Sequence, residues 1–235
     1  MRLGLLGYPI QHSKSPELYR KYLANRLSSY ELFSFENKIM IPDLNFFRSR
    51  LDGLNITSPY KSHFFHEVII NNPAVTSLGS INTIGFSPNG IFGTNTDLVA
   101  VKKILTNFKA RYPKINILLL GDGVMANLTR VVALELGIHL NQFSRRLFEG
   151  FKDLDFSKYY QIDSQPIVIN ACSRDYIFTG DLTGEEIFWD YNYAFAPHAS
   201  LLPQLVKSYI DGQELLELQA ISAIEFWEEL TPKLK

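Results

Sequence analysis

The chain has 235 residues, of which 46% are hydrophobic and 20% are charged, and its formal net charge is −1. These values predict a globular protein of one large domain or two modest ones, and they give no support for nucleic acid or an anionic membrane as a partner. The single cysteine, Cys172, excludes an intramolecular disulfide and favours a cytoplasmic location, and no apolar run approaches membrane-spanning length.

The N-terminal region alternates expected strands with expected helices, which is typical of an α/β domain. Apolar patterning predicts strands at residues 3–6, 30–35 and 54–57, and a hairpin of residues 81–86 and 91–94 around Pro88-Asn89-Gly90. A helix is expected at residues 16–27, with Ser15 as its cap. A second helix is expected to start at Pro42, with Leu44, Phe47 and Leu51 on its inner face, and a third at residues 62–70.

The second half of the chain predicts a parallel sheet. Residues 115–120 form an apolar run with Asn116 as its one polar residue, which is typical of a central parallel strand. A glycine loop, a helix at residues 126–136 and a strand at residues 138–143 follow it, which is the order of a βαβ unit. Further strands are expected at residues 166–171 and 186–191, and amphipathic helices at residues 98–108 and 213–230. We place a domain boundary inside the helix at residues 98–108.

Four short polar segments in the N-terminal region are not explained by apolar patterning, and each lies beside Gly or Pro. They are residues 12–16, 55–61, 79–83 and 93–97. Their hydroxyl and carboxamide groups suit the binding of a small polyhydroxylated acid. Lys61 and Asp97 suit proton transfer, because a partly desolvated lysine holds its proton less tightly and an aspartate orients it through a charge-assisted hydrogen bond. The alternative is that Lys61 is an ordinary solvated surface residue.

Other polar residues have two interpretations. Ser13, Ser15 and Thr57 suit a substrate carboxylate or hydroxyl, or they serve as helix caps and strand packing. Asn82 either meets a ligand or stabilises a turn. Gln219 lies on the apolar side of the last expected helix, where a polar residue usually has a partner or a ligand.

The glycine loop predicts a dinucleotide site. Gly121-x-Gly123-x-x-Ala126 follows a strand and precedes a helix, so its backbone is suited to approach a pyrophosphate. Asp122 and Val124 count against this interpretation. After the next strand come Ser144, Arg145 and Arg146, where arginines favour the 2′-phosphate of NADP, unless both are solvated surface residues. His63, His66 and Glu67 have helical spacing but no evident third set of metal ligands, so we predict no metal site.

Four motifs occur in order in the N-terminal half. They are residues 7–16 (Gly-Tyr-Pro-Ile-x-His-Ser-x-Ser-Pro), 55–61 (Asn-Ile-Thr-x-Pro-x-Lys), 80–83 (Ser-Ile-Asn-Thr) and 93–97 (Gly-x-Asn-Thr-Asp). Three more follow at residues 170–173 (Asn-Ala-Cys-Ser), 190–193 (Asp-x-x-Tyr) and 212–220 (Gly-x-x-Leu-Leu-x-x-Gln-Ala). In sequence and order these motifs resemble the shikimate dehydrogenase family. One such match alone would be weak, but the preserved order makes the resemblance specific.

The resemblance implies an NADP-dependent oxidoreductase that interconverts shikimate and 3-dehydroshikimate in the biosynthesis of aromatic amino acids. It implies a substrate domain of residues 1–98 and 211–235, with the C-terminal helix packing back on it, and a Rossmann-like NADP-binding domain of residues 99–210. Lys61 and Asp97 are implied as the catalytic pair. The implied substrate-binding residues are Ser13, Ser15, Thr57, Asn82, Asp97, Tyr193 and Gln219. The implied cofactor-binding residues are Gly121, Gly123, Val124, Met125, Ala126, Ser144, Arg145, Arg146 and Tyr193. We expect a small-molecule substrate and a monomer or homodimer.

The sequence departs from the family pattern mainly in the nucleotide half. Asp122, Val124 and Met125 interrupt the usual Gly-Ala-Gly-Gly-Ala loop, and Arg174-Asp175 replaces a glycine after Ser173. The chain is also short for the family, and the shortening falls in the nucleotide domain. Preference for NADP or NAD therefore stays open, as do two alternatives: a quinate or aminoshikimate dehydrogenase, and a non-catalytic shikimate-binding paralogue.

Overall fold

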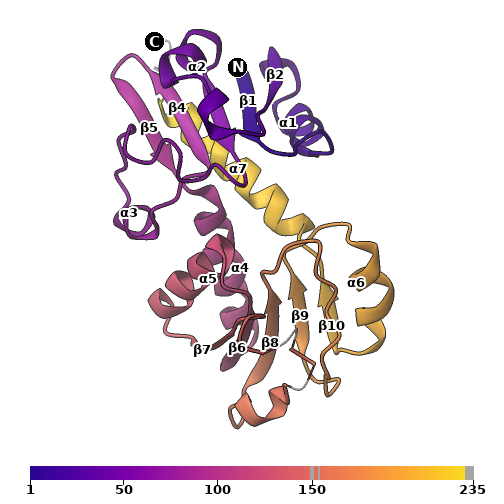
Figure 1. Ribbon diagram of the computed structural model, residues 1–235. Coiled ribbons are helices and arrows are strands. Elements are labelled where there is room, and N and C mark those ends of the chain that lie inside the picture. The colour runs from indigo at the N-terminus through magenta and orange to yellow at the C-terminus, as the bar shows by residue number, and fades with distance from the viewer. Residues whose placement is uncertain (149–150, 153, 231–235) are drawn as a thin grey trace. The chain divides into compact units, whose positions relative to one another are not determined.

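The computed structural model describes residues 1–148, 151–152 and 154–230. It divides into two compact units (Figure 1): unit 1 contains Met1–Val99 and Glu217–Lys235, and unit 2 contains Ala100–Leu216. Residues 231–235, which the sequence assigns to the substrate domain, lie outside the described residues. Each unit contains a sheet and helices, so the predicted α/β class is confirmed.

Unit 1 contains a mixed sheet with the strand order β2-β1-β3-β4-β5. β1 pairs in parallel with β2 and β3, whereas β4 is antiparallel to β3 and β5. The strands are β1 (Arg2–Gly7), β2 (Ser29–Ser34), β3 (Gly53–Ile56), β4 (Thr83–Ser87) and β5 (Gly90–Thr94). The helices that lie wholly within this unit are α1 (Ser15–Leu23), η1 (Ala24–Arg26), η2 (Lys38–Met40), α2 (Leu44–Arg50) and α3 (Pro73–Leu78).

The core of unit 1 follows the apolar periodicity of the sequence. The predicted inner face of α2 is confirmed, because Leu44, Phe47 and Leu51 are all buried. Asp43 caps this helix by accepting a hydrogen bond from the Phe46 N–H at 2.9 Å. The same core contains buried side chains from β1, β3 and β4, so the helix and the sheet share one apolar layer.

Two expectations for unit 1 are wrong. Residues 61–67 form consecutive turns instead of the expected helix, and Ile69 pairs with the β5 edge through hydrogen bonds of 2.9 Å to Ile91 and Gly93. Tertiary pairing with a strand edge thus overrides the helical pattern. The first helix begins at Ser15, so Ser15 is not its cap, and it ends at Leu23 because Ala24 has φ +47°.

The C-terminal helix α7 (Gln213–Leu230) packs on the unit 1 sheet, as predicted. Trp227 is 2% exposed, and its Nε1 donates a hydrogen bond to the Ile84 carbonyl at 2.8 Å. The indole occupies the space above Gly53, where an added Cβ would lie 2.4 Å from the ring. The glycine in β3 is therefore what lets the helix approach the sheet.

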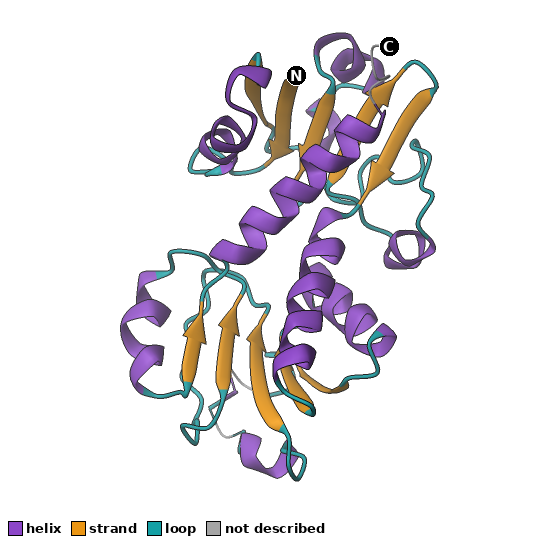
Figure 2. Ribbon diagram, turned by 180° about the vertical axis from the view of Figure 1, so that it is seen from behind, coloured by secondary structure: helices purple, strands orange, loops and turns teal. Residues whose placement is uncertain are grey.

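Unit 2 contains a wholly parallel sheet with the strand order β10-β9-β8-β6-β7, visible as strands pointing the same way in Figure 2. The strands are β6 (Ile115–Leu120), β7 (His139–Phe143), β8 (Gln165–Asn170), β9 (Ile187–Asp190) and β10 (Ser208–Ile210). The helices are α4 (Thr96–Arg111), which starts in unit 1, α5 (Val124–Glu135), η4 (Phe156–Tyr159), α6 (Ala196–Leu201) and η5 (Leu202–Gln204).

The order of this sheet is Rossmann-like. β6 is buried at every position and lies between β7 and β8, so the chain reverses direction across the sheet after β7. In open α/β sheets, ligands bind at the carboxyl ends of the strands at such a reversal. The loops that follow β6, β7 and β8 are therefore the ones to consider for a nucleotide.

Among the described residues, no helix combines the length and the hydropathy needed to cross a membrane.

We predict that Trp227→Ala lowers the free energy of unfolding by about 3–5 kcal/mol, because it removes a buried aromatic side chain from the contact between α7 and the sheet. Trp227→Phe keeps most of the ring and loses the hydrogen bond to Ile84, so it should cost about 1 kcal/mol. Urea unfolding followed by circular dichroism measures both. Glu225→Ala, at an exposed position of the same helix, is the control, and an equal loss in this variant would contradict the prediction.

Candidate active site

A nearly buried ion pair lies at the centre of the polar segments of unit 1. Lys61 Nζ donates to Asp97 Oδ2 at 2.7 Å, and the two side chains are 17% and 12% exposed. Such a charge-assisted contact is short and orients the ammonium group. Surface ion pairs of flexible side chains contribute little, but low exposure reduces both solvent screening and side-chain freedom here.

The backbone on both sides of this pair is fixed by the fold. Lys61 follows β3 after a turn, and its carbonyl accepts a hydrogen bond from the Ile81 N–H at 2.8 Å. Asp97 lies in the first turn of α4, where the partial positive charge of the helix terminus favours a carboxylate. Asn95 Oδ1 accepts from the Leu98 N–H at 3.3 Å and so satisfies one of the first N–H groups of this helix.

Asn82 connects the hairpin to the same helix start. Its Oδ1 accepts hydrogen bonds from the Thr96 N–H at 2.7 Å, from Thr96 Oγ1 at 3.2 Å and from Thr83 Oγ1 at 3.0 Å. Because the amide oxygen is used in this way, a substrate contact of Asn82 would have to come from its amide nitrogen. The side chain is thus both a structural clamp and a substrate-binding candidate.

A line of hydrogen bonds joins Ser15 to this hairpin. The Ser15 side chain bonds the Tyr30 hydroxyl, which donates to Asn55 Oδ1 at 3.4 Å, and Asn55 Nδ2 donates to Thr83 Oγ1 at 3.2 Å. Burial raises the pKa of Tyr30 well above its usual value, so its hydroxyl stays protonated. Sequence reasoning did not select Tyr30 or Asn55 as site residues. Asn55 opens the polar segment at residues 55–61, whereas Tyr30 gives no signal beyond a hydroxyl group on an expected strand.

The remaining unit 1 candidates lie near the ends of β1 and β3 and on α7. Ser13 is half-buried, and its Oγ accepts a hydrogen bond from the Ser15 N–H at 3.2 Å. Thr57 continues the pairing of β3 with β1 by donating its N–H to the Leu6 carbonyl at 2.8 Å. An added Cβ at Gly7 would lie 2.3 Å from Thr57 Cγ2, so this glycine makes room for the threonine. Gln219 is half-buried on α7.

In unit 2, the glycine loop has the properties that a pyrophosphate site needs. Gly121 has φ +119°, and an added Cβ would lie 3.2 Å from the Ala171 backbone, so only glycine fits there. Gly123 is the N-cap of α5 without a side-chain cap, and an added Cβ would meet nothing within 4 Å. The helix therefore starts without a side-chain cap, and such a helix N-terminus is suited to an anion. Val124 is exposed, Met125 is half-buried and Ala126 is buried.

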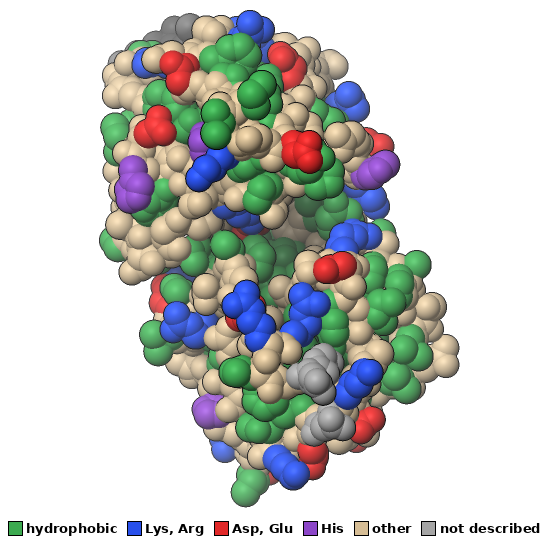
Figure 3. Space-filling model, in the orientation of Figure 1, with side chains coloured by type: hydrophobic (Ala, Val, Ile, Leu, Met, Phe, Trp, Pro, Cys, Tyr) green, Lys and Arg blue, Asp and Glu red, His purple; other side chains and the backbone are tan. Residues whose placement is uncertain are grey.

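The residues after β7 lie against this loop. Ser144 Oγ donates to Asp122 Oδ2 at 2.7 Å, and Arg146 Nε lies 3.7 Å from the same oxygen. The Arg145 guanidinium lies 4.9 Å from the centre of the Tyr176 ring, and its Nη2 donates to Ser173 Oγ at 3.5 Å. Figure 3 shows Lys and Arg side chains gathered on this view of unit 2, in the lower half of the picture. The structure thus places Arg145 and Arg146 beside the loops that follow β8 and β6, respectively.

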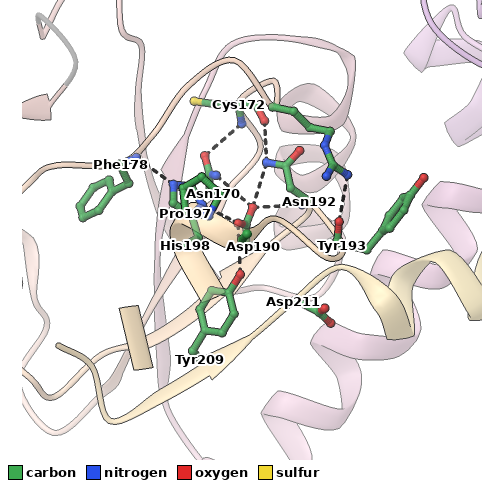
Figure 4. Close-up of polar contacts among 12 residues, drawn as sticks. Asn170, Cys172, Phe178, Asp190, Asn192, Tyr193, Pro197, His198, Tyr209 and Asp211 are labelled. Atoms are coloured by element: carbon green, nitrogen blue, oxygen red, sulfur yellow. Dashed lines mark hydrogen bonds and ion pairs between the residues drawn. The ribbon is translucent and has the colours of Figure 1, made fainter. Parts of the chain in front are cut away.

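A buried carboxylate organises the loops after β8 and β9 (Figure 4). Asp190 is fully buried, and its Oδ1 accepts hydrogen bonds from Asn170 Nδ2 and from the Asn192 N–H, each at 3.0 Å. His198 Nδ1 lies 2.5 Å from Asp190 Oδ2, while His198 Nε2 accepts from the Phe178 N–H at 2.8 Å. The proton of this neutral imidazole is therefore on Nδ1. The arrangement fixes both loops at the carboxyl edge of the sheet.

Tyr193 follows β9 in this organised region and is half-buried. Arg174 Nη1 donates to the Tyr193 carbonyl at 2.9 Å, and the guanidinium lies 5.4 Å from the centre of the Tyr193 ring. Arg174, which stands where the family pattern has a glycine, thus joins the loop after β8 to the loop after β9.

No cluster of three or more His, Cys, Asp or Glu side chains suited to a metal occurs in the part of the chain that the structure describes.

Comparison with known proteins gives a consistent picture. Residues 5–84 match the family model described as shikimate dehydrogenase substrate binding domain. The chain is 27% identical over 262 residues to shikimate dehydrogenase (NADP(+)) of Herminiimonas arsenicoxydans, covering 99% of this chain and 93% of the relative. It is 26% identical over 251 residues to the protein of the same name from Clostridium botulinum strain Hall, covering 95% of each.

Solved structures agree with the fold. The shikimate dehydrogenase of Aquifex aeolicus superposes with a TM-score of 0.76 at 19% identity, over 99% of this chain and 94% of that one. The shikimate 5-dehydrogenase of Thermus thermophilus, in complex with NADP(H) and shikimate, gives a TM-score of 0.73 at 20% identity, over 99% and 95%. At these identities the superpositions establish the fold of the two units.

Cys172 at the end of β8 provides a pH-dependent test of this region. Burial raises the pKa of its thiol to about 11, so we predict slow alkylation by iodoacetamide near pH 8 and a rate that rises about tenfold per pH unit up to about pH 10. It is the only cysteine, so the signal has one source. The urea-unfolded chain is the control and should react as an ordinary thiol. A half-maximal rate near pH 8.5 in the folded protein would contradict this prediction.

Proposed function

We propose that this chain, which belongs to the shikimate dehydrogenase family, catalyses the NADP-linked interconversion of shikimate and 3-dehydroshikimate. The curated relatives that it matches over 95% or more of its length carry the name shikimate dehydrogenase (NADP(+)). The observation that carries the proposal is the contact of 2.7 Å between Lys61 and Asp97, with both side chains largely buried. A protein that only binds the acid would not require this pair.

In the proposed reaction the protein moves the proton. When bound, NADP supplies the hydride acceptor, and the organic chemistry of that step belongs to the cofactor. Lys61 exchanges a proton with the oxygen on the substrate carbon that is oxidised or reduced, and Asp97 holds the ammonium group in position. The pair is supported from the backbone by Ile81 and by the first turn of α4.

The substrate-binding assignment rests on the resemblance and on the placement of the residues. Ser13 and Ser15 would hold the carboxylate, and Ser15 is also tied to Tyr30. The residues assigned to the rest of the substrate are Thr57, Asn82, Asp97, Tyr193 and Gln219. The corresponding domain assignment is residues 1–98 and 211–235 for substrate and residues 99–210 for NADP.

The cofactor assignment is supported by the uncapped start of α5 and by the arginines after β7. Gly121, Gly123 and Ala126 would form the pyrophosphate loop with Val124 and Met125, because the glycine turn precedes a helix N-terminus that has no side-chain cap. Ser144, Arg145 and Arg146 would face the adenosine ribose and its 2′-phosphate. We expect Tyr193 to contact both the nicotinamide and the substrate.

Two alternatives are tested by the same assay. Rates measured side by side with shikimate, quinate and an aminoshikimate identify the preferred acid. Binding of shikimate by calorimetry without turnover with NADP or NAD would instead indicate a non-catalytic paralogue. We propose a cytoplasmic enzyme on the basis of its single buried cysteine, and sedimentation would distinguish a monomer from a homodimer.

We predict that Lys61→Ala lowers kcat roughly 10²- to 10⁴-fold while shikimate binding changes only a few-fold, because the proton-transfer group is lost and the other polar contacts remain. Turnover is followed by the absorbance of reduced NADP, and binding is followed by calorimetry. Lys102→Ala is the control, since Lys102 is an exposed lysine on α4 paired with Glu135. Unchanged kcat in Lys61→Ala would refute the assigned role.

A further inference from the structure

Asp122 occupies an unusual place for a carboxylate. It stands between the two glycines of the loop after β6, yet its side chain reaches the end of the neighbouring strand β7. There its Oδ2 accepts the hydrogen bond from Ser144 Oγ at 2.7 Å and lies 3.7 Å from Arg146 Nε. Ser144 Oγ also accepts a hydrogen bond from the Arg146 N–H at 3.3 Å. Asp122, Ser144 and Arg146 therefore form one connected group.

This position matters because the end of the second strand of a Rossmann-like unit is where adenosine ribose recognition takes place. A carboxylate there accepts hydrogen bonds from the ribose hydroxyls of NAD, whereas an arginine binds the 2′-phosphate of NADP. In this chain both groups are present and lie 3.7 Å apart. The guanidinium comes from the end of β7, as expected for NADP, and the carboxylate comes from the glycine loop.

We propose that Asp122 is a specificity-determining residue that lowers the preference of this protein for NADP over NAD. The inference rests on the proposed function, which it deepens by assigning the cofactor selectivity. Asp122 holds the Arg146 guanidinium and adds a negative charge where the 2′-phosphate would bind. The same carboxylate is a hydrogen-bond acceptor for a free ribose 2′-hydroxyl. Both effects favour binding of NAD over binding of NADP, whereas the arginines favour NADP.

The exposure of the pair sets the size of the effect. The side chain of Arg146 is 87% exposed and that of Asp122 is 47% exposed, so water and salt screen their attraction. Arg146 is thus able to turn from Asp122 to a phosphate at small cost. Asp122 therefore reduces NADP binding by a few-fold and does not abolish it, which is compatible with an NADP-linked enzyme.

Asp122→Asn is the informative substitution, because it removes the charge and keeps an amide oxygen able to accept the hydrogen bond from Ser144. A purely structural role of Asp122 in tying the two loops would therefore be largely preserved. Arg146→Gln removes the cation from the other side of the contact. Asp163→Asn is the matched control, since Asp163 is exposed and precedes the amino end of β8, away from the loops at the carboxyl ends of the strands. Its φ of +58° is one that Asn tolerates.

The experiment is calorimetric titration of the full-length protein with NADP+ and, separately, with NAD+, without substrate. For Asp122→Asn we expect NADP+ to bind roughly three- to fivefold more tightly and NAD+ to bind equally well or more weakly. The control should bind both cofactors as the wild type does. In the Arg146→Gln background, the gain from Asp122→Asn should shrink to less than about twofold, because the two side chains act as one coupled pair.

The outcomes separate the inference from the proposed function. Wild-type binding of both cofactors, with an unchanged NADP+ to NAD+ affinity ratio in Asp122→Asn, would overturn the inference alone. An equal gain in the Arg146→Gln background would overturn it too, because the effect would then not act through Arg146. A wild-type protein that binds neither cofactor would overturn the proposed function and the inference together.

Discussion

The start of α4 is tied to the hairpin by the hydrogen bond that the Thr96 N–H donates to Asn82 Oδ1 at 2.7 Å. Both residues are almost fully buried, so loss of this bond would leave an unsatisfied polar group at a cost of about 1–3 kcal/mol. Asp97 is the next residue along the helix, and it holds Lys61. The Asn82 amide therefore helps to set the position of Lys61 from two contacts away, so the polar residues of this region serve both the fold and the candidate site.

Much of the architecture could be predicted from the sequence because local pattern and tertiary packing agree. Apart from Asn116, the run at residues 115–120 is apolar on both faces, and β6 is buried between two other strands. The apolar periodicity of α2 predicts a buried face, and Leu44 and Phe47 on that face are buried. The segments containing Lys61 and Asp97 could be identified for the opposite reason. They are polar, they lie beside turn formers, and the packing of an apolar core does not explain their charged residues. Proximity of the two side chains was a hypothesis, and the structure places them in contact.

Other features could not be read from local pattern because distant residues create them. A helix is expected at residues 62–70, but residues 61–67 form turns and hydrogen bonds join Ile69 to the β5 edge. Tyr30 and Asn55 are both predicted to lie on strands, and they do. Their side chains come together only because β2, β1 and β3 are neighbours in the sheet, and this forms the link from Ser15 to the hairpin. The pairing of Asp122 with Arg146 likewise requires the parallel neighbours β6 and β7.

The edge position of β7 explains why these loop contacts matter. The Rossmann order 3-2-1-4-5-6 has a further strand outside the second one, but among the described residues β7 is the edge of the sheet. Its half-exposed polar sequence fits that position. Without an outer strand, the segment after β7 is held by side chains: Asp122 binds Ser144 and Arg146 from one side, and Ser173 and Tyr176 contact Arg145 from the other. The residues that would recognise the nucleotide thus also fasten the edge of the sheet, so changes in cofactor selectivity and in local stability are coupled.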